Sequence, residues 1–208
     1  MISGNGIDPE QFKLKGIERD SYRCIYASSY DRGLEHLLKI WPDVKKEVPQ
    51  ANLHIFYGWG LFDKMFYNNP ERKMWKERMC KLMEQEGITE YGKVSQDQII
   101  EETFKSGVWA YPTHFGEISC ITAMKCQAAG VVPVVIDYAA VHETVQYGVK
   151  VQGDIYDEET KNKFKDELIK MLKDPKRQEE IRKEMMPWAV NKFSWSKISD
   201  QWTKGFNE

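Results

Sequence analysis

The 208-residue sequence lacks the signatures of several large protein classes. No stretch approaches the roughly 20 consecutive apolar residues that cross a bilayer, and no signal peptide follows Met1. The formal net charge is only -2, from 30 Lys and Arg against 32 Asp and Glu, so the chain has no general attraction to nucleic acid. We therefore expect no transmembrane segment and no nucleic-acid partner.

The sequence also has little that points to a metal or to disulfides. Its four cysteines follow no CxxC spacing, and they fall inside predicted core elements, where free thiols are usual (Cys24, Cys80, Cys120 and Cys126). His54 and His114 have no second ligand at metal spacing, so we expect both to be structural. A reducing cytoplasm is the expected compartment, and no metal or cofactor is expected.

Predicted strands alternate with predicted helices along most of the chain, without internal repeats. Strands are expected at residues 22–27, 52–57, 88–91, 108–111, 131–136 and 148–151. Helices are expected at 33–48 and 69–86, after Ser95, between Glu117 and Gly130, and from Asp157 onward, with breaks at Pro175, Pro187 and Ser194. This rhythm predicts an α/β fold of the Rossmann-like, doubly wound type, a parallel sheet with helices on both faces. The first 20 residues read as a connector.

The segment from Pro112 to Val135 carries the clearest candidate site. A strand leads through Pro-Thr-His-Phe-Gly to Glu117, and a small-residue helix and an apolar strand follow, which is a βαβ unit. Ligands of such units collect at the carboxyl ends of parallel strands, so a ligand is expected at the loop from Thr113 to Glu117. An alternative is that Glu117 only stabilises a helix N-terminus.

Two further strand ends carry candidate residues. Arg32 precedes Gly33 at the start of a helix, where backbone N–H groups and a guanidinium would together bind phosphate. The alternative is an exposed Arg32 paired with Asp31 or Glu35. After the second strand, Gly58 permits close approach of the backbone to a ligand, or forms a plain turn.

Together these segments resemble the C-terminal, nucleotide-sugar-binding half of a GT-B glycosyltransferase, most like family 4 of the retaining enzymes. The resemblance runs nearly end to end and rests on NGIDPEQF, YASSYDRGLEHLLKIWP, LHIFYGWG and FGEISCITAMKCQAAGVVPVV. It implies that Arg32 binds the donor diphosphate and that Glu117 forms hydrogen bonds with the donor sugar, both as catalytic residues. The implied donor-contacting residues are Ser28, Ser29, Arg32, Gly33, Gly58, Gly92, Lys93, Val94, Gly116, Glu117, Ile118, Ser119 and Lys125.

The sequence departs from the family pattern in two places. Lys125 replaces the second Glu of the E-x7-E motif, which contacts the ribose in relatives, and either donates to ribose or phosphate or points to solvent. Ser28 or Ser29 stands at the position of the second basic residue that binds the diphosphate in the family pattern. We also expect a fragment of a longer enzyme, with a connector (1–20), a donor-binding domain (21–190), a closing helix (191–208) and a missing N-terminal acceptor domain.

The resemblance implies transfer of a sugar from a nucleotide diphosphate donor, UDP or GDP based, to a glycan or glycoconjugate acceptor with retention. The full-length enzyme is expected in the cytoplasm, with peripheral membrane attachment left open. The alternative function is a non-catalytic nucleotide-binding module. A Rossmann-type dehydrogenase or epimerase is disfavoured, because the first loop reads SSYDRG and contains no GxGxxG.

Overall fold

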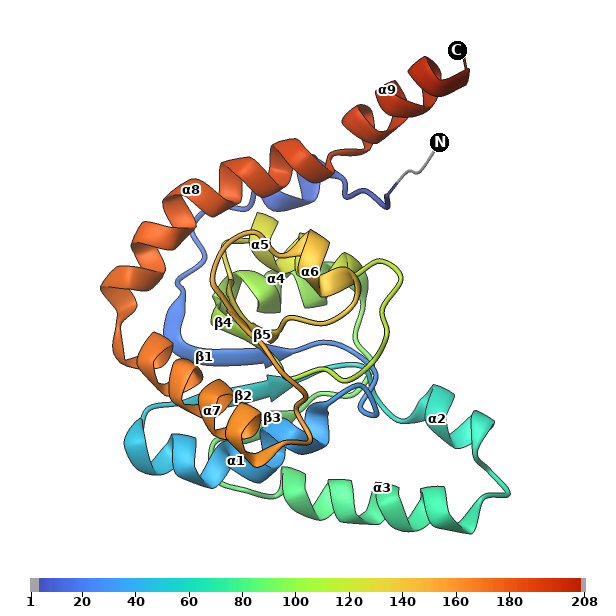
Figure 1. The fold of residues 1–208 in the computed structure, drawn as a ribbon, viewed down its shortest axis with the longest axis vertical. Helices are drawn as coiled ribbons and strands as arrows, with labels where there is room; N and C mark the ends of the chain where they lie inside the picture. The colour runs from blue at the N-terminus through green and yellow to red at the C-terminus, as the bar shows by residue number, and fades with distance from the viewer. Residues whose placement is uncertain (1–3, 207–208) are drawn as a thin grey trace.

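A single parallel sheet forms the centre of the computed structural model, which describes residues 4–206 (Figure 1). Its strands are β1 (Asp20–Tyr26), β2 (Asn52–Ile55), β3 (Ile88–Glu90), β4 (Ser106–Tyr111), β5 (Val132–Ile136) and β6 (Val149–Val151). Every pairing is parallel, and the order across the sheet is β3-β2-β1-β4-β5-β6. Residues 1–3 of the expected connector and 207–208 of the expected closing helix lie outside the described residues.

Helices cover both faces of this sheet, which confirms the predicted doubly wound α/β fold. The helices of the described residues are η1 (Pro9–Phe12), α1 (Leu34–Glu47), α2 (Gly60–Met65), α3 (Pro70–Met83), α4 (Gln96–Lys105), α5 (Ile121–Ala128), α6 (Ala140–Thr144), α7 (Glu158–Lys173), α8 (Pro175–Phe193) and α9 (Trp195–Phe206). In Figure 1, α1 and α7 lie on one side of the sheet, and α4, α5 and α8 lie on the other. No helix within residues 4–206 is both long enough and apolar enough to cross a membrane.

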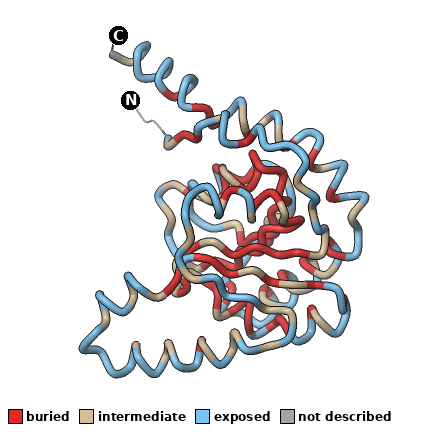
Figure 2. The backbone as a smooth tube through the Cα atoms, turned by 180° about the vertical axis from the view of Figure 1, so that it is seen from behind, coloured by how far each residue is buried: buried red, intermediate tan, exposed pale blue. Residues whose placement is uncertain are grey.

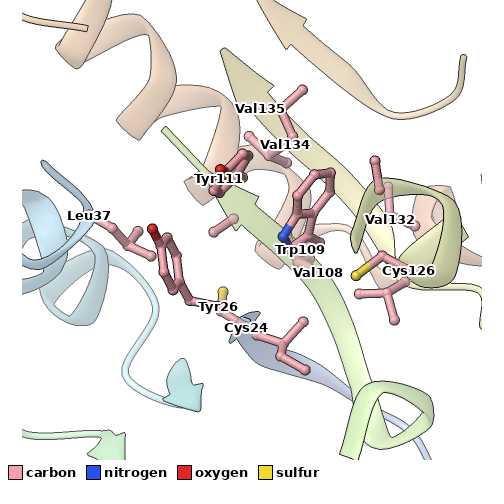
Figure 3. Close-up of a cluster of buried hydrophobic side chains, with 14 of the residues drawn as sticks. Cys24, Tyr26, Leu37, Val108, Trp109, Tyr111, Cys126, Val132, Val134 and Val135 are labelled. Carbon is pink, nitrogen blue, oxygen red and sulfur yellow. The ribbon is translucent and has the colours of Figure 1, made fainter. Parts of the chain in front are cut away.

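The central strands are buried on both faces, as parallel strands between two helix layers must be. Every residue of β4 and β5 is buried, and Figure 2 shows the buried positions concentrated in the sheet. The rings of Trp109 and Tyr111 on β4 stack at 5.0 Å, and Tyr111 meets Tyr26 of β1 at 5.8 Å (Figure 3). This packing holds the carboxyl ends of β1 and β4 in a fixed relation.

Local sequence signals account for several helix ends. Ser95 is the N-cap of α4, and its hydroxyl accepts a hydrogen bond from the backbone N–H of Gln98 at 3.2 Å, as the capping pattern predicts. Gly130 follows α5 with φ of 81°, the left-handed conformation that glycine adopts after a helix.

The predicted break at Pro187 is wrong, because α8 runs without interruption through that residue. A proline inside a helix costs one backbone hydrogen bond, and here tertiary packing on both sides offsets that cost. Met185 and Ala189 are fully buried, and the Trp188 ring contacts Tyr147 of the segment before β6 at 5.4 Å. The sequence does not predict the short helices α2 and α6, because neither segment is long enough to show a repeating helical pattern of apolar residues.

The first described residues are hydrogen-bonded to the end of the chain. Ile7 donates its backbone N–H to Phe193 at 2.7 Å and accepts from Trp195 at 3.1 Å. Its side chain is only 2% exposed. The segment expected to act as a connector is therefore packed onto the junction between α8 and α9.

Candidate functional site

The strand order creates a crevice at the carboxyl ends of β1 and β4. From β1 the chain proceeds to β2 and β3 on one side, and β4 to β6 extend the sheet on the other. Loops that leave neighbouring strands in opposite directions leave a gap between them, and ligands of open parallel sheets bind at such points. The β1–α1 loop and the β4–α5 loop, both predicted to carry site residues, border this crevice.

Gly33 allows the two loops to touch backbone to backbone. Its φ of 117° is unfavourable for other residues, and a Cβ built there would lie 2.3 Å from the carbonyl oxygen of Pro112. No larger residue fits unless the loops move apart. The glycine therefore allows direct contact between the two loops that border the crevice.

Arg32 and Glu117, which are 85 residues apart in sequence, meet directly across this crevice. The Nη1 atom of Arg32 lies 3.0 Å from Oε1 of Glu117. The same carboxylate oxygen accepts a hydrogen bond from the hydroxyl of Tyr111 at 2.9 Å. The guanidinium also lies 4.1 Å from the ring centre of Phe115. The alternative pairing of Arg32 with Asp31 or Glu35 does not occur, because its carboxylate partner is Glu117.

Arg32 is charged and Tyr111 is protonated at neutral pH, and their surroundings reinforce both states. Partial burial acts to lower the pKa of Arg32, but the charge and hydrogen bond of Glu117 outweigh it, and the pKa is raised. Burial is the main cause that raises the pKa of Tyr111, and the neighbouring Glu117 carboxylate adds to it. Tyr111 is therefore a hydrogen-bond donor at neutral pH, and it helps to orient Glu117.

The helices that start beside the crevice have no side-chain cap. Gly33, at the start of α1, has no side chain that could cap the helix, and Cys120, at the start of α5, makes no capping hydrogen bond. The starts of α2, α6 and α7 also lack a side-chain cap, whereas α3, α4 and α8 are capped by Asn69, Ser95 and Asp174. Uncapped first turns present backbone N–H groups and the positive end of the helix dipole to an anion.

A pocket of about 650 Å³ adjoins the crevice at the ends of β1, β2 and β3. Its lining includes three residues of the predicted set, namely Lys93, Val94 and Lys125. Its other lining residues come from the ends of β1 and β2 and from α2, α4 and α5: Ala27, Phe56, Tyr57, Gly60, Leu61, Lys64, Gln96, Ile99, Thr103, Ile121, Thr122 and Cys126. The lining has an apolar part and three lysines, and it contains no carboxylate.

Lys125 lines this pocket, and both alternatives for its side chain, donation to ribose or phosphate and direction toward solvent, stay open. It extends from α5, and its Nζ donates to Oε1 of Gln96 at 3.0 Å. Lys93 and Val94, which follow β3, line the same pocket.

The glycines near the pocket serve contacts between loops. A Cβ on Gly58, whose φ is 80°, would lie 2.8 Å from the backbone nitrogen of Lys93. The N–H of Gly58 donates to the hydroxyl of Tyr30 at 2.9 Å, and Tyr57 donates to the carbonyl of Gly92 at 2.9 Å. These contacts join the loops after β2 and β3, so the close approach that Gly58 permits is to the neighbouring loop.

The remaining predicted residues lie on the same edge of the sheet with different exposures. Ser28 is buried, and the hydroxyl of Ser29 donates to Asp31 at 2.7 Å. Gly116 has no atom within 4 Å of a built Cβ, and Ile118 is 98% exposed. Ser119, which is half-buried, accepts a backbone hydrogen bond from Ile121 at 3.2 Å.

Sequence reasoning missed three side chains at this edge. Lys64 lies on the unpredicted helix α2, and Tyr111 was assigned only to a strand. The sequence indicates only that Phe115 lies in a loop. One signal for Tyr111 is available in the sequence: it is the last residue of a strand, and the loop that follows this strand is a candidate site.

Two of the histidines contribute to packing beside the site. The rings of His36 and His114 are 5.4 Å apart, and Tyr156 contacts both. Burial lowers the pKa of His36 to about 4, so the ring is neutral at neutral pH. Among residues 4–206, no three His, Cys, Asp or Glu side chains are placed to hold a metal ion.

A second pocket, of about 640 Å³, lies at the opposite edge, where β1, β2 and β4 begin. Its cations already have partners: Arg23 pairs with Glu102, and Arg19 donates to the backbone carbonyl oxygens of Ser106 and Ala129. The crevice and the adjoining pocket are therefore the better candidate site.

Comparison with known proteins identifies the family. The family model for glycosyl transferases group 1 matches residues 8–186. HepE of Anabaena, solved in complex with UDP, gives a TM-score of 0.78 at 12% identity and covers 100% of this chain and 57% of that chain. Sucrose-phosphate synthase from Thermosynechococcus elongatus gives a TM-score of 0.71 at 16% identity, with coverage of 98% and 51%.

The pneumococcal O-GlcNAc transferase GtfA, in complex with UDP and GlcNAc, gives a TM-score of 0.68 at 15% identity. The match covers 98% of this chain and 38% of that one, so the chain spans between 38% and 57% of these three structures. No curated protein matches the sequence. The family match extends over most of the chain, and the chain belongs to the glycosyl transferases group 1 family.

Proposed function

We propose that this chain is the donor-binding half of a retaining glycosyltransferase, which moves a sugar from a nucleotide diphosphate to a glycan or glycoconjugate acceptor. The observation that carries the proposal is the meeting of Arg32 and Glu117 at 3.0 Å between two uncapped helix starts. Structures with this fold have been solved with UDP, with UDP and glucose, and with UDP-glucose, which supports a nucleotide sugar as the ligand.

The proposed roles follow from the geometry of the crevice. Negative charge develops on the leaving diphosphate, where the guanidinium of Arg32 and the N–H groups of α1 and α5 would stabilise it. Glu117, held by Tyr111, would accept hydrogen bonds from the donor sugar and align the bond that breaks. The binding site for the acceptor would be supplied by a part of the enzyme outside this chain. We propose that no metal or cofactor takes part.

The ion pair between Arg32 and Glu117 affects how a ligand can bind. Because the two side chains are paired with each other, a nucleotide sugar must compete with this contact or share it. When a diphosphate binds Arg32, oxygen atoms of Glu117 become free to accept hydrogen bonds from sugar hydroxyls. Binding of the two halves of the donor is therefore expected to be coupled.

Titration calorimetry with UDP, UDP-glucose, GDP and GDP-mannose tests the proposal. We expect one of the two series to bind with one site per chain. Glu117→Gln should weaken the nucleotide sugar about tenfold or more and leave the bare nucleoside diphosphate much less affected, because a hydrogen bond to a charged group contributes about 1.5–3 kcal/mol. Arg32→Gln should weaken both. Glu84→Gln and Arg78→Gln, at exposed positions on or next to α3, are the controls.

Absence of binding by all four ligands would overturn the proposal. Binding of a nucleoside diphosphate without any added affinity for its sugar would favour the alternative, a nucleotide-binding module without transfer activity. The proposed compartment is the cytoplasm, on the ground that all four cysteines are free and three are buried.

A further inference from the structure

The pocket beside the crevice has a marked imbalance of charge. Three lysines line it from three different elements: Lys64 from α2, Lys93 from the segment after β3, and Lys125 from α5. No Asp or Glu lines it. Lysines spread over a surface are ordinary, but convergence from separate elements on one cavity concentrates positive potential where a ligand would lie.

The three amino groups are also free of ion pairs among the described residues. Lysines elsewhere, such as Lys76, Lys165 and Lys173, lie within 3 Å of a carboxylate. Lys64 and Lys93 have no such partner in residues 4–206, and Lys125 contacts only the neutral amide of Gln96. Their charge is therefore available to a ligand.

The crevice, in contrast, contributes no net charge. Arg32 is compensated by Glu117 at 3.0 Å, and Tyr111 is neutral at neutral pH, as tyrosine ordinarily is. The helix starts add partial charges only. A nucleoside diphosphate carries several negative charges, so its attraction to this edge of the sheet must come largely from elsewhere.

We propose that Lys64, Lys93 and Lys125 bind the phosphate groups of the nucleotide and supply most of its electrostatic attraction. The inference rests on the proposed function and adds Lys64, on helix α2, to the donor site. The nucleoside lies against the apolar lining, which includes Phe56, Val94 and Ile99. Its phosphates pass the lysines on the way to Gly33 and Glu117.

The lysine chemistry favours phosphate over a ribose diol. A Lys ammonium donates three hydrogen bonds and accepts none, so it cannot take the protons of two sugar hydroxyls as a carboxylate does. It is a common point-charge partner of phosphate. Lys125 is therefore better suited to contact a phosphate than the two ribose hydroxyls.

The test compares nucleosides with nucleotides on the intact chain. Calorimetry measures uridine, UMP and UDP, or the guanosine series if GDP is the better ligand, with Lys64→Met, Lys93→Met and Lys125→Met. Each variant should weaken the diphosphate about tenfold or more and the nucleoside by less than twofold. Lys→Arg at each position should keep most of the affinity. Lys197→Met, at an exposed position on α9, is the matched control.

Salt provides an independent readout. Raising NaCl should weaken UDP binding to the wild type more steeply than binding to the triple Met variant. If the wild type binds UDP or GDP and the Met variants match the Lys197 control, the lysine assignment is wrong and the proposed function stands. If the variants weaken uridine as much as UDP, the lysines contact the nucleoside and the assignment is also wrong. If the wild type binds neither nucleotide, both proposals fail.

Discussion

Replacement of Gly33 by alanine tests whether contact between the two loops shapes the site. A Cβ at this position would lie 2.3 Å from the carbonyl oxygen of Pro112, roughly 0.7 Å short of the 3.0 Å limit that real Cβ contacts respect. The obstacle is backbone, which cannot rotate away as a flexible side chain would. The alanine would also adopt a φ of 117°, which non-glycine residues rarely occupy.

These two effects set the size of the expected change. Backbone strain of this kind costs about 1–3 kcal/mol, and overpacking adds about 1–3 kcal/mol. We therefore expect Gly33→Ala to reduce the free energy of unfolding by about 2–6 kcal/mol. With a urea dependence of about 2–3 kcal/mol/M, the midpoint should fall by about 0.7–3 M.

Gly116→Ala is the matched control, because it lies in the opposing loop without a positive φ and with nothing within 4 Å of a built Cβ. Urea unfolding of both variants, followed by circular dichroism, should leave the control within about 0.5 kcal/mol of the wild type. Displacement of Pro112 should also shift Glu117 away from Arg32 and weaken UDP binding. Equal stability of Gly33→Ala and Gly116→Ala would refute the account of this contact.

Two further predictions concern stability. Burial lowers the pKa of His36 from 6.5 to about 4. Between pH 6.5 and pH 4 the unfolded chain therefore binds more protons than the folded chain, and the free energy of unfolding should fall by up to about 3 kcal/mol as the pH drops through this range. His36→Gln should reduce this loss in urea titrations at pH 6.5 and 4.5, and an unchanged loss would contradict the assignment. Ala139 has φ of 50° and ψ of -135°, so Ala139→Gly should raise the thermal midpoint through a gain of about 1 kcal/mol, whereas a lower midpoint would show that the strain is absent.

The sheet was predictable because its strands carry strong local signals. Apolar, β-branched runs separated by helix-period segments define parallel strands, and these appear within one or two residues of their predicted ends. The order of the strands made Arg32 and Glu117 neighbours, since both follow strands at the centre of the sheet. An arginine and a glutamate in these two loops were therefore enough to predict which residues face each other across the crevice.

Other features depend on contacts that a single sequence does not encode locally. Pro187 reads as a helix break, and only burial of Met185 and Ala189 maintains the helix through it. Lys64 lies on a helix of six residues with no apolar period, so its place in the pocket follows from tertiary structure alone. The pairing of Arg32 with Glu117, in place of nearer acids, likewise depends on how the two loops pack.

A crystal structure of this chain grown with UDP, or with GDP if calorimetry selects it, tests the central claim most directly. The account predicts a diphosphate between the starts of α1 and α5 at the carboxyl ends of β1 and β4. The nucleoside should occupy the pocket of about 650 Å³ lined by Lys125. A nucleotide bound at the opposite edge, in the pocket that contains Arg19 and His54, would contradict it.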